Sequence, residues 1–259
     1  MEQPGRQLPV ESRSCQISVV IPVKDDAKEL ALCLAALGQQ TRRPDEVIVV
    51  DNDSTDDSAT VAAVWGATVL TCTDPGIPAA SSHGYDHATG DLILRLDADC
   101  VPPDTWVADV ERAFARDSAL GAVTGPARFH DGPRLLRAPL AAAYLAAYTA
   151  AGVLALGHRP LFGSNLAMRR AVWETVAPSI ERGDPELHDD FALSYRVGEC
   201  FRIGRLRADP MGISMRPFGS LSSLRRRGRR GFHTVKAQWP EDFPPYRWRK
   251  LVSRPVKGG

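Results

Sequence analysis

The sequence has few cysteines and lacks glycine-rich phosphate-binding loops. Its 259 residues include five cysteines, an odd number, and no two of them form a Cys-x-x-Cys pair. This pattern argues against a disulfide framework and a zinc site, so we expect a reducing, cytoplasmic setting. Neither Gly-x-Gly-x-x-Gly nor Gly-x-x-x-x-Gly-Lys occurs in the chain, which disfavours a dinucleotide dehydrogenase and a P-loop NTPase.

The apolar segments are too weak to indicate export or membrane insertion. Residues 1–16 are polar and contain prolines without an apolar core, so we expect a flexible lead-in rather than a signal peptide. Residues 138–156 carry no charge and reach the length that spans a bilayer. They are rich in alanine and contain Pro139 and Gly152. The free energy of membrane insertion is far less favourable for these residues than for Leu or Ile. We expect a buried or surface-docking helix there.

Charge is distributed unevenly along the chain, although the formal net charge is only +1. The segment from Arg216 to the C-terminus holds 12 of the 32 Lys and Arg residues and only two acidic residues. The remainder is therefore acidic, which suits metal chelation. The basic segment, with five arginines between residues 225 and 230, suits phosphate, acidic lipid or nucleic acid. The alternative reading of this run is a solvated helix face.

The hydrophobic pattern predicts alternating strands and helices. Residues 17–22 and 47–50 are continuous β-branched runs, typical of parallel strands that are covered on both faces. Further strands are expected near 68–72, 91–96, 121–129 and 203–215. Helices are expected at 27–40, 54–65 (from a capping box at Ser54 to Asp57), 77–89, 104–115, 138–156, 169–176, 190–197 and 220–236. This order predicts an α/β fold: one domain with a Rossmann-like, mostly parallel sheet flanked by helices.

Two aspartates follow the apolar run of residues 92–96. Asp97 and Asp99 are separated by one residue, so in an extended segment their carboxylates point the same way. Oxygen ligands without cysteine or paired histidine favour Mg²⁺ or Mn²⁺, which can also bind a diphosphate. The sequence therefore predicts a metal site for Mn²⁺ or Mg²⁺ at this strand end, and the alternative is a pair of solvated aspartates.

Acidic clusters also follow the first two expected strands. Strand one runs into Asp25 and Asp26, and strand two runs into Asp51, Asp53 and Asp56. The carboxyl ends of parallel strands meet at one edge of a sheet, so these carboxylates should face the same crevice as Asp97 and Asp99. Such carboxylates can accept hydrogen bonds from the base and ribose of a nucleotide, although an Asx-turn that caps a helix would look the same.

Several segments together resemble the family-2 glycosyltransferases of the GT-A fold. Residues 17–22 resemble the opening strand of that family, residues 49–56 its nucleotide-binding turn, and residues 96–99 its metal motif. Residues 162–169 and 189–196 resemble its acceptor-side loop and its Glu-Asp-x-Asp-Leu-Ser-x-Arg element. The resemblance covers residues 17–236, with a nucleotide-binding half at about 17–100 and an acceptor half at about 101–236. Residues 237–259 are expected to form a basic tail that contains Pro and Arg.

The resemblance implies an inverting enzyme that moves one sugar from a nucleoside diphosphate sugar, with a UDP-sugar favoured, to an acceptor hydroxyl. It implies donor binding by Pro22, Asp25, Asp51, Asp53 and Asp97, metal binding by Asp97 and Asp99, and an acceptor side formed by Gly163, Ser164, Asn165 and Asp189. Asp190 is implied as the general base. The fold sometimes recruits a C-terminal histidine to the metal, so His233 is a third candidate ligand.

Departures from the family pattern leave some assignments open. Asp189 stands where the family often has Glu, and Ala192 stands where it often has a second Asp. The Gln-x-x-Arg-Trp element of processive members is absent, which implies a nonprocessive enzyme. In a helix over 220–236, Arg226, Arg229 and Arg230 share one face, and we hypothesise that Arg229 or Arg230 reaches the donor diphosphate.

Two alternatives from other classes remain at this stage. A nucleotidyltransferase would share the sheet and the metal, but it should have a basic, glycine-rich loop after its first strand, where this chain is acidic. A protein that binds phosphate or an anionic surface would need only the arginine run. A further candidate property is peripheral contact between the basic C-terminus and the inner face of an anionic membrane. No nucleic acid is expected as a partner.

Overall fold

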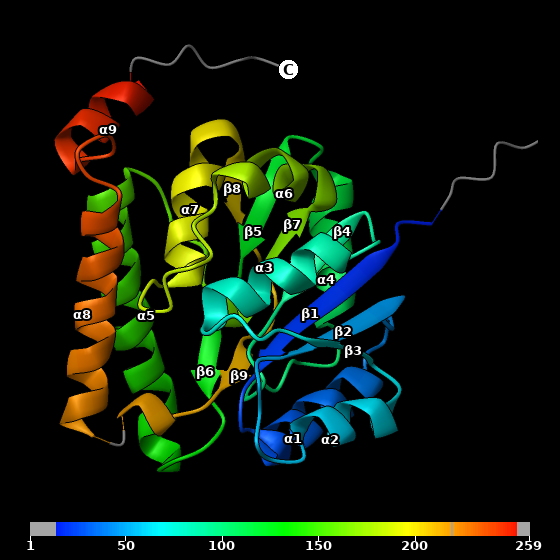
Figure 1. Cartoon of the computed structure of the whole chain (residues 1–259). Coiled ribbons are helices and arrows are strands. Elements are labelled where there is room, and N and C mark those ends of the chain that lie inside the picture. Colours follow the sequence, from blue (N-terminus) through cyan, green and yellow to red (C-terminus); the bar gives the residue numbers. More distant parts are fainter. Residues whose placement is uncertain (1–13, 219, 253–259) are drawn as a thin grey trace, which may run out of the picture.

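A mixed seven-stranded sheet forms the centre of the computed structural model, which describes residues 14–218 and 220–252 (Figure 1). The strands of this sheet are β1 (Ile17–Val23), β2 (Glu46–Asp51), β3 (Thr68–Thr71), β4 (Leu92–Arg95), β5 (Leu120–Thr124), β7 (Leu166–Arg169) and β8 (Arg202–Arg205). Their spatial order is β3-β2-β1-β4-β7-β5-β8, and β7 runs antiparallel to both of its neighbours. A separate parallel pair joins β6 (Ala127–Phe129) to β9 (Met211–Ile213).

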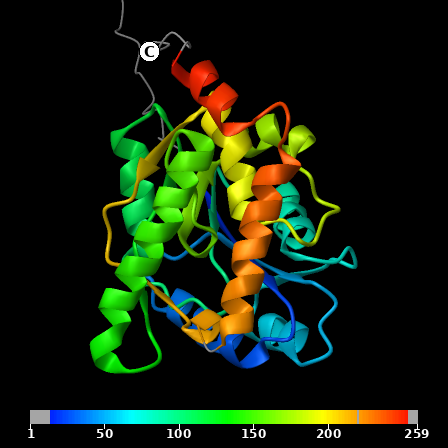
Figure 2. The same ribbon diagram turned by 90° about the vertical axis from the view of Figure 1, so that its left-hand side faces the viewer.

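Helices cover both faces of the sheet, and further helices stand on one side of the molecule (Figures 1 and 2). They are α1 (Ala27–Gly38), α2 (Ser58–Trp65), α3 (Ile77–His87), α4 (Trp106–Arg116), α5 (Arg134–Leu156), α6 (Arg170–Val176), α7 (Asp189–Cys200), α8 (Leu221–Ala237) and α9 (Pro244–Val252), with short 3-10 turns η1 (Gly163–Asn165), η2 (Ala177–Ser179) and η3 (Arg216–Phe218). Helices α5 and α8 run along one side of the molecule in the same direction. The expected α/β architecture with a mostly parallel sheet is confirmed.

Alternation along β1 places side chains in two separate cores. Ile17, Val19 and Ile21 are buried in the cluster that contains residues of α1 and α4. Val20 points to the opposite face and packs in the cluster that contains residues of α3 and α6. Successive side chains of a strand alternate between faces, so a continuous apolar run buries both faces of the sheet.

The antiparallel strand β7 brings the acceptor-side loop to the strand ends. Leu166, the first residue of β7, lies opposite Arg95, the last residue of β4. The turn η1 comes immediately before β7, so it lies beside the segment that follows β4. The carboxyl ends of β1, β2 and β4 therefore share one edge of the sheet with η1.

Helix α5 is long and apolar enough to cross a membrane, by length and composition only. Of its most apolar window, 22% is buried inside the protein. The helix begins at Arg134 and ends at Leu156, and the following Gly157 has a φ of 78°, the left-handed conformation that favours glycine. Its contacts with β6, α7 and α9 tie it to the domain. Tyr148 of α5 donates a hydrogen bond to the backbone of Leu161 (2.7 Å), so the helix is part of the fold.

The expected start of the second helix at Ser54 was wrong. Helix α2 begins at Ser58 and not at Ser54, because the Ser54 hydroxyl accepts the backbone N–H of Asp25 in the neighbouring loop. Within the expected basic tail, α9 follows α8. In α9, the buried Arg247 donates to the backbone oxygens of Leu156 and Tyr195 (2.8 Å each). Residues 1–13 and 253–259 of the expected lead-in and tail lie outside the described residues.

Candidate active site

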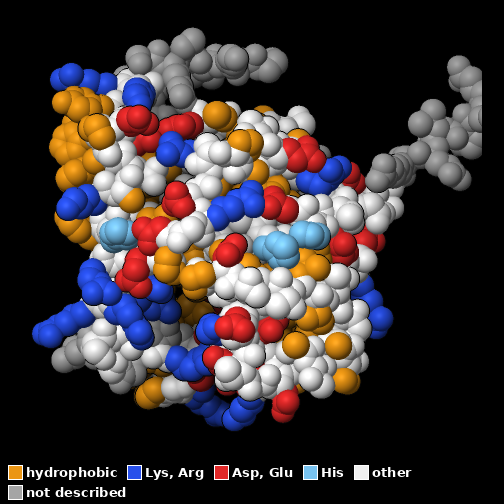
Figure 3. Space-filling model, in the orientation of Figure 1, with side chains coloured by type: hydrophobic (Ala, Val, Ile, Leu, Met, Phe, Trp, Pro, Cys, Tyr) orange, Lys and Arg blue, Asp and Glu red, His pale blue; other side chains and the backbone are white. Residues whose placement is uncertain are grey.

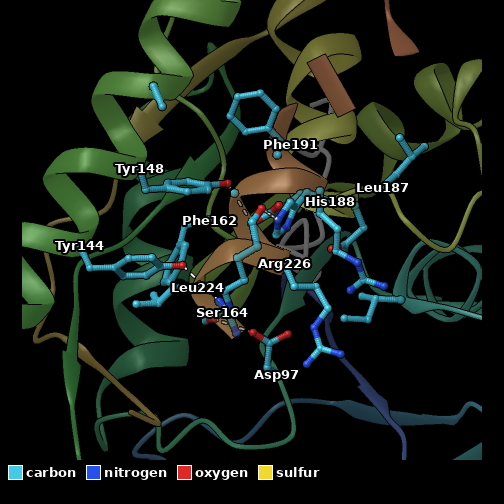
Figure 4. Close-up of a pocket in the computed structure, with 18 of the residues that line it drawn as sticks. Asp97, Tyr144, Tyr148, Phe162, Ser164, Leu187, His188, Phe191, Leu224 and Arg226 are labelled. Atoms are coloured by element: carbon cyan, nitrogen blue, oxygen red, sulfur yellow. Dashed lines mark hydrogen bonds between the residues drawn. The ribbon is translucent and has the colours of Figure 1, made fainter. Parts of the chain in front are cut away.

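A cavity of about 880 Å³ lies between the strand ends and helices α5, α7 and α8. Figure 4 shows Asp97 at one end of it and Phe191 at the other, with Tyr144 and Tyr148 projecting from α5. A smaller cavity of about 260 Å³ adjoins it and is lined by Pro22, Asn52, Asp97 and Asp99, among others. Asp97 and Asp99 line both cavities, so the acidic pair stands at their junction.

Asp97 and Asp99 lie close enough together to share a cation. Their carboxylate oxygens lie within 4.8 Å of one another. Asp97 accepts hydrogen bonds from Ser164 Oγ at 2.6 Å and from the Arg95 guanidinium at 2.9 Å. Burial and the charge of Asp97 raise the pKa of Asp99. A carboxylate that is buried beside a second carboxylate is unfavourable to ionise, and a bound divalent cation would favour its ionised form.

Cys100 lies in the same cluster but is a poor ligand for a hard cation. It is fully buried, and burial together with the charges of Asp97 and Asp99 raises the pKa of its thiol well above the usual range. A thiolate is a soft ligand, whereas hard cations such as Mg²⁺ and Mn²⁺ prefer oxygen. The donor set is therefore two carboxylates, which fits Mn²⁺ or Mg²⁺.

Arg216 is a site residue that sequence analysis missed. Its guanidinium donates to both carboxylate oxygens of Asp26, at 2.8 and 2.5 Å, and to Asp99 at 2.9 Å. These hydrogen bonds join η3 to the ends of β1 and β4. Nothing in the local sequence marks Arg216, because its partners lie more than 100 residues away.

The loops after β1 and β2 hold each other in place. Asp25, with φ of 50°, accepts hydrogen bonds from the backbone N–H and the hydroxyl of Thr55 (2.6 and 3.0 Å), which lower its pKa. Lys24 donates to the backbone oxygens of Asn52 and Asp53 (2.8 and 2.9 Å). Asp51 at the end of β2 is buried, and its Oδ1 has no hydrogen-bond partner among the described residues.

These residues lie at one edge of the sheet, but most of the carboxylates that were expected to face the crevice of Asp97 and Asp99 do not line it. Pro22 lines the smaller cavity, whereas Asp25, Asp51 and Asp53 are absent from its lining. Asn52, which does line it, receives the backbone N–H of Gly76 on Oδ1 (2.9 Å) and donates from Nδ2 to Cys72 and Asp74. It thereby fixes the start of α3 beside the cavity.

A second acidic pair begins helix α7 and lines the larger cavity. Asp190 Oδ2 accepts the backbone N–H of Gly163 at 2.8 Å and lies 3.0 Å from the Tyr148 hydroxyl, whose one proton is shared with the backbone oxygen of Leu161. Its Oδ1 is buried without a partner among the described residues. Burial and the charge of Asp190 raise the pKa of Tyr148 well above its usual range, so this phenol stays a hydrogen-bond donor.

Arg95 connects the two acidic pairs. Its guanidinium, of which only 2% is exposed, lies 2.9 Å from Asp97 and 3.2 Å from Asp189. Asp189 also accepts the Ser81 hydroxyl at 3.0 Å. A β-carbon on Gly163 would overlap the Arg95 guanidinium, so glycine is required there. Sequence analysis passed over Arg95 because it stands inside a strand pattern.

The acceptor-side loop divides into one cavity residue and one structural residue. Ser164 lines the larger cavity and donates to Asp97. Asn165 is buried and faces away from the acidic pairs: its Oδ1 accepts Trp106 Nε1 and its Nδ2 donates to Pro126 O, both at 2.9 Å. The structure thus gives Asn165 a role in packing η1 against α4.

The arginines of α8 are arranged differently from the expected face. Arg226, Arg227 and Arg230 line the larger cavity, and Arg229 does not. Arg229 pairs with Glu186 at 3.0 Å on the surface, while Arg230 donates to Pro185 O and Glu186. The cavity spans a wide arc of α8, so the adjacent Arg226 and Arg227 both face it. Figure 3 shows Lys and Arg side chains gathered over this part of α8 beside a hollow.

His233 is not brought together with the acidic pair. Its Nε2 lies 2.7 Å from Asp184, and it does not line either cavity. Val235 and Gly231 of the same helix face the cavity, so His233 falls on the outer side. Another histidine, His130, lies beside the site, with Nε2 at 3.1 Å from the backbone oxygen of Asp99.

The family model of glycosyl transferase family 2 matches residues 18–176. The chain belongs to this family. Glycosyltransferase AglE of Haloferax volcanii is 31% identical to it over 113 residues, which are 40% of this chain and 36% of that protein. The chain aligns with about a third of the length of such curated relatives.

Solved structures share the fold. A mannosyltransferase from Pyrobaculum calidifontis, in complex with GDP-mannose and Mn²⁺, has a TM-score of 0.66 at 20% identity, covering 97% of this chain and 73% of that one. Glucosyl-3-phosphoglycerate synthase from Mycobacterium tuberculosis, in complex with Mn²⁺, UDP and phosphoglyceric acid, has a TM-score of 0.61 at 18% identity, covering 86% and 76%. The family and these neighbours identify the domain as a GT-A glycosyltransferase.

Proposed function

We propose that this glycosyltransferase moves one sugar from a nucleoside diphosphate sugar to an acceptor hydroxyl, with inversion at the anomeric carbon. One observation carries the proposal: the acidic pairs Asp97/Asp99 and Asp189/Asp190, which lie far apart in the sequence, line one cavity. A donor needs a cation for its diphosphate, and an acceptor needs a base for its proton, so the two pairs supply what the transfer requires.

The smaller cavity is assigned to the nucleotide. Pro22 and Asn52 line it, and the unpartnered Oδ1 of Asp51 lies at the same edge of the sheet. Asp51 is buried behind the lining of the cavity, so we assign it to the support of this edge, and uracil stays the base that the resemblance to the family favours. Asp25 and Asp53 shape the loops that hold the base and ribose. Complexes of the structural neighbours with UDP or a GDP-sugar support this assignment.

Asp97 and Asp99 are assigned to a divalent cation, Mn²⁺ or Mg²⁺. When bound, the cation neutralises charge that builds on the leaving diphosphate. The raised pKa of Asp99 fits such a group, and the Mn²⁺ complexes of the neighbours agree with it. Arg227 lines both cavities, so we assign the hydrogen bonds to the diphosphate to Arg227 rather than to Arg229. Arg230, which lines only the larger cavity, is the second candidate. Charged hydrogen bonds of this kind strengthen as negative charge develops on the leaving group.

Asp190 is assigned as the general base. Tyr148 and Gly163 fix its Oδ2, while Oδ1 has no partner and remains able to accept the hydroxyl proton. Asp189 is less suited, because Arg95 and Ser81 already engage its carboxylate. Deprotonation of the hydroxyl as it attacks from the face opposite the leaving group produces inversion in one displacement.

Nucleotidyl transfer and simple anion binding are weaker candidates. The family match is to glycosyltransferases, and three of the five clustered arginines line the same cavity as the acidic pairs. Contact with an anionic membrane remains part of the proposal, because α5 and α8 carry exposed apolar residues and α8 also carries the clustered arginines. Leu136, Leu154 and Phe232 are 48%, 62% and 65% exposed.

The experiment that tests this function is a panel of nucleotide sugars with Mn²⁺. Thermal stabilisation and hydrolysis identify the donor, and we expect a UDP-sugar to give the largest effect. Proton NMR of the product then compares the anomeric configuration with that of the donor. A product of unchanged configuration would refute the single displacement, and stabilisation that persists in EDTA would refute the metal assignment.

A further inference from the structure

The larger cavity continues past the acidic pairs as an apolar groove between α5 and α8. Its α5 wall consists of Tyr144, Ala147, Tyr148 and Ala151. These residues have the spacing i, i+3, i+4 and i+7, so they form one face of the helix. At a rise of 1.5 Å per residue they extend for about 10 Å. No charged side chain belongs to this wall.

The α8 wall is apolar toward its far end and open in its middle. Phe232 and Val235 line the groove together with Phe191 of α7. A β-carbon added at Gly228 would meet no atom within 4 Å, and one added at Gly231 would meet only His188 at 4.0 Å. The two glycines therefore leave room beside the helix axis. A slender apolar chain fits this space better than a bulky glycan.

Arg226 stands at the polar end of the groove. Among residues 14–218 and 220–252 it forms no ion pair or hydrogen bond, although the other cavity-lining arginines, such as Arg216 and Arg230, have partners. Arg227 also lines the smaller cavity of the donor, whereas Arg226 is absent from that lining. Arg227 and Arg230 line the same cavity from α8, and Arg227 donates to the Tyr144 hydroxyl of the α5 wall at 3.3 Å. Arg226, which has no partner among the described residues, is complementary to an anionic group that is attached to an apolar chain.

We propose that the acceptor is a single-chain amphiphile, whose anionic head group binds Arg226 and whose apolar chain lies between α5 and α8. This inference rests on the proposed function, because it treats the larger cavity as the acceptor site. The sugar is transferred to a hydroxyl of the head group near Asp190. The chain follows the groove toward Phe191 and Val235, where it is removed from water.

Binding of decyl phosphate, measured by calorimetry below its micelle concentration with UDP and Mn²⁺ present, tests the proposal. The ten-carbon chain matches the length of the groove. We expect decyl phosphate to bind at least about a hundredfold more tightly than butyl phosphate, because six additional methylene groups are buried. Inorganic phosphate should be weaker still. Equal affinity for decyl phosphate and inorganic phosphate would overturn the proposal and leave a simple anion site.

Matched variants locate the two parts of the probe. Ala147→Phe fills the groove and should weaken decyl phosphate at least about tenfold. Ala146→Phe makes the same change at a neighbouring exposed position outside the cavity lining and should have little effect. Arg226→Ala should also weaken binding about tenfold, while Arg225→Ala, another exposed arginine outside the lining, should not.

The binding of UDP and Mn²⁺ to the same variants tests the proposed function separately from the amphiphilic acceptor. If every variant binds UDP and Mn²⁺ like the wild type, a loss at Ala147→Phe and Arg226→Ala supports the amphiphile. If the wild type binds neither UDP nor Mn²⁺, the proposed function fails by itself. If Ala146→Phe weakens decyl phosphate as much as Ala147→Phe does, the probe adsorbs on the outer surface of α5, and the groove assignment is wrong.

Discussion

At the scale of single residues, Asp99 of the candidate site carries a charge that destabilises the metal-free fold. Burial and Asp97 raise its pKa, so the folded chain holds this proton more tightly than the unfolded chain. The free energy of unfolding without metal therefore falls as the pH rises from the unfolded pKa of Asp99 through the folded one. Carboxylates placed for a cation commonly have this cost.

We therefore predict that Asp99→Asn raises the thermal midpoint of the metal-free protein at neutral pH and abolishes the stabilisation by UDP with Mn²⁺. Scanning calorimetry with and without Mn²⁺ measures both effects. In the wild type, protons compete with Mn²⁺ for the Asp99 carboxylate. As the pH is lowered, the Mn²⁺ affinity should therefore begin to decline at a higher pH than it does for aspartates with an ordinary pKa. Retention of Mn²⁺-dependent UDP binding in Asp99→Asn would contradict the metal assignment.

Asp190 and Asp189 offer a direct comparison within one helical turn. Asp190→Asn keeps the size of the side chain but cannot take a proton, so turnover should fall by about 10²- to 10⁴-fold while donor affinity is retained. Steady-state kinetics and UDP binding by calorimetry measure the two quantities separately. Asp189→Asn is the control: it should affect turnover less, and an equal or larger loss there would move the base to Asp189.

Arg95 is a buried cation whose loss leaves two carboxylates uncompensated. Arg95→Met should lower the free energy of unfolding by about 3 kcal/mol, the usual effect of breaking a buried ion pair from one side. Arg170→Met removes an ion pair of two exposed side chains, with Glu174 at 2.6 Å, and should cost less than about 1 kcal/mol. Urea unfolding of both variants decides whether Arg95 stabilises the site as the geometry suggests.

At the scale of elements, α8 is an amphipathic helix whose two sides carry different arginines. Arg227 faces both cavities and Arg229 faces Glu186 at the surface. We predict that Arg227→Ala lowers kcat/KM by about thirtyfold, equivalent to about 2 kcal/mol for a lost charged hydrogen bond. Arg229→Ala is the matched control and should change kcat/KM less than about twofold. Equal losses at both positions would indicate a diffuse electrostatic patch.

The sequence predicted the regular elements better than it predicted the contacts of α8. Residues 17–22 and 47–50 form strands because their continuous apolar runs suit only a sheet covered on both faces. The orientation of α8 depends on packing against α5 and α7, which local periodicity does not contain. For this reason the expected face of Arg226, Arg229 and Arg230 differs from the observed lining, which contains Arg227 and not Arg229.

The same limit applies to the candidate site. Asp97, Asp99 and Asp190 were predictable because short motifs place them directly after a strand or at the start of a helix. Arg216 and Tyr148 reach the site through tertiary contacts with Asp99 and Asp190, and nothing near them in the sequence indicates those partners. His233 was a candidate ligand by position in the chain, but its helix turns it toward Asp184.

At the scale of the whole molecule, apolar and basic surfaces lie on the same side. Leu136 and Leu154 are exposed and are separated by 18 residues, which is five helical turns, so they share one face of α5. Trp248 of α9 and Phe232 of α8 are also exposed. Figure 3 shows hydrophobic side chains over α9 and the upper part of α8, above the basic cluster. Apolar side chains beside arginines are typical of surfaces that adsorb to anionic membranes.

We predict that the protein sediments with vesicles that contain anionic lipid and much less with neutral vesicles. The double variant Leu136→Ser and Leu154→Ser should weaken this binding about tenfold, because less apolar surface enters the interface. Val64→Ser is the control, since Val64 of α2 is 84% exposed but lies away from α5. Added salt should weaken the attraction to the arginines. Binding that is unaffected by salt and by the double variant would mean that this face does not contact the membrane. As a control, UDP and Mn²⁺ binding should stay unchanged in every variant.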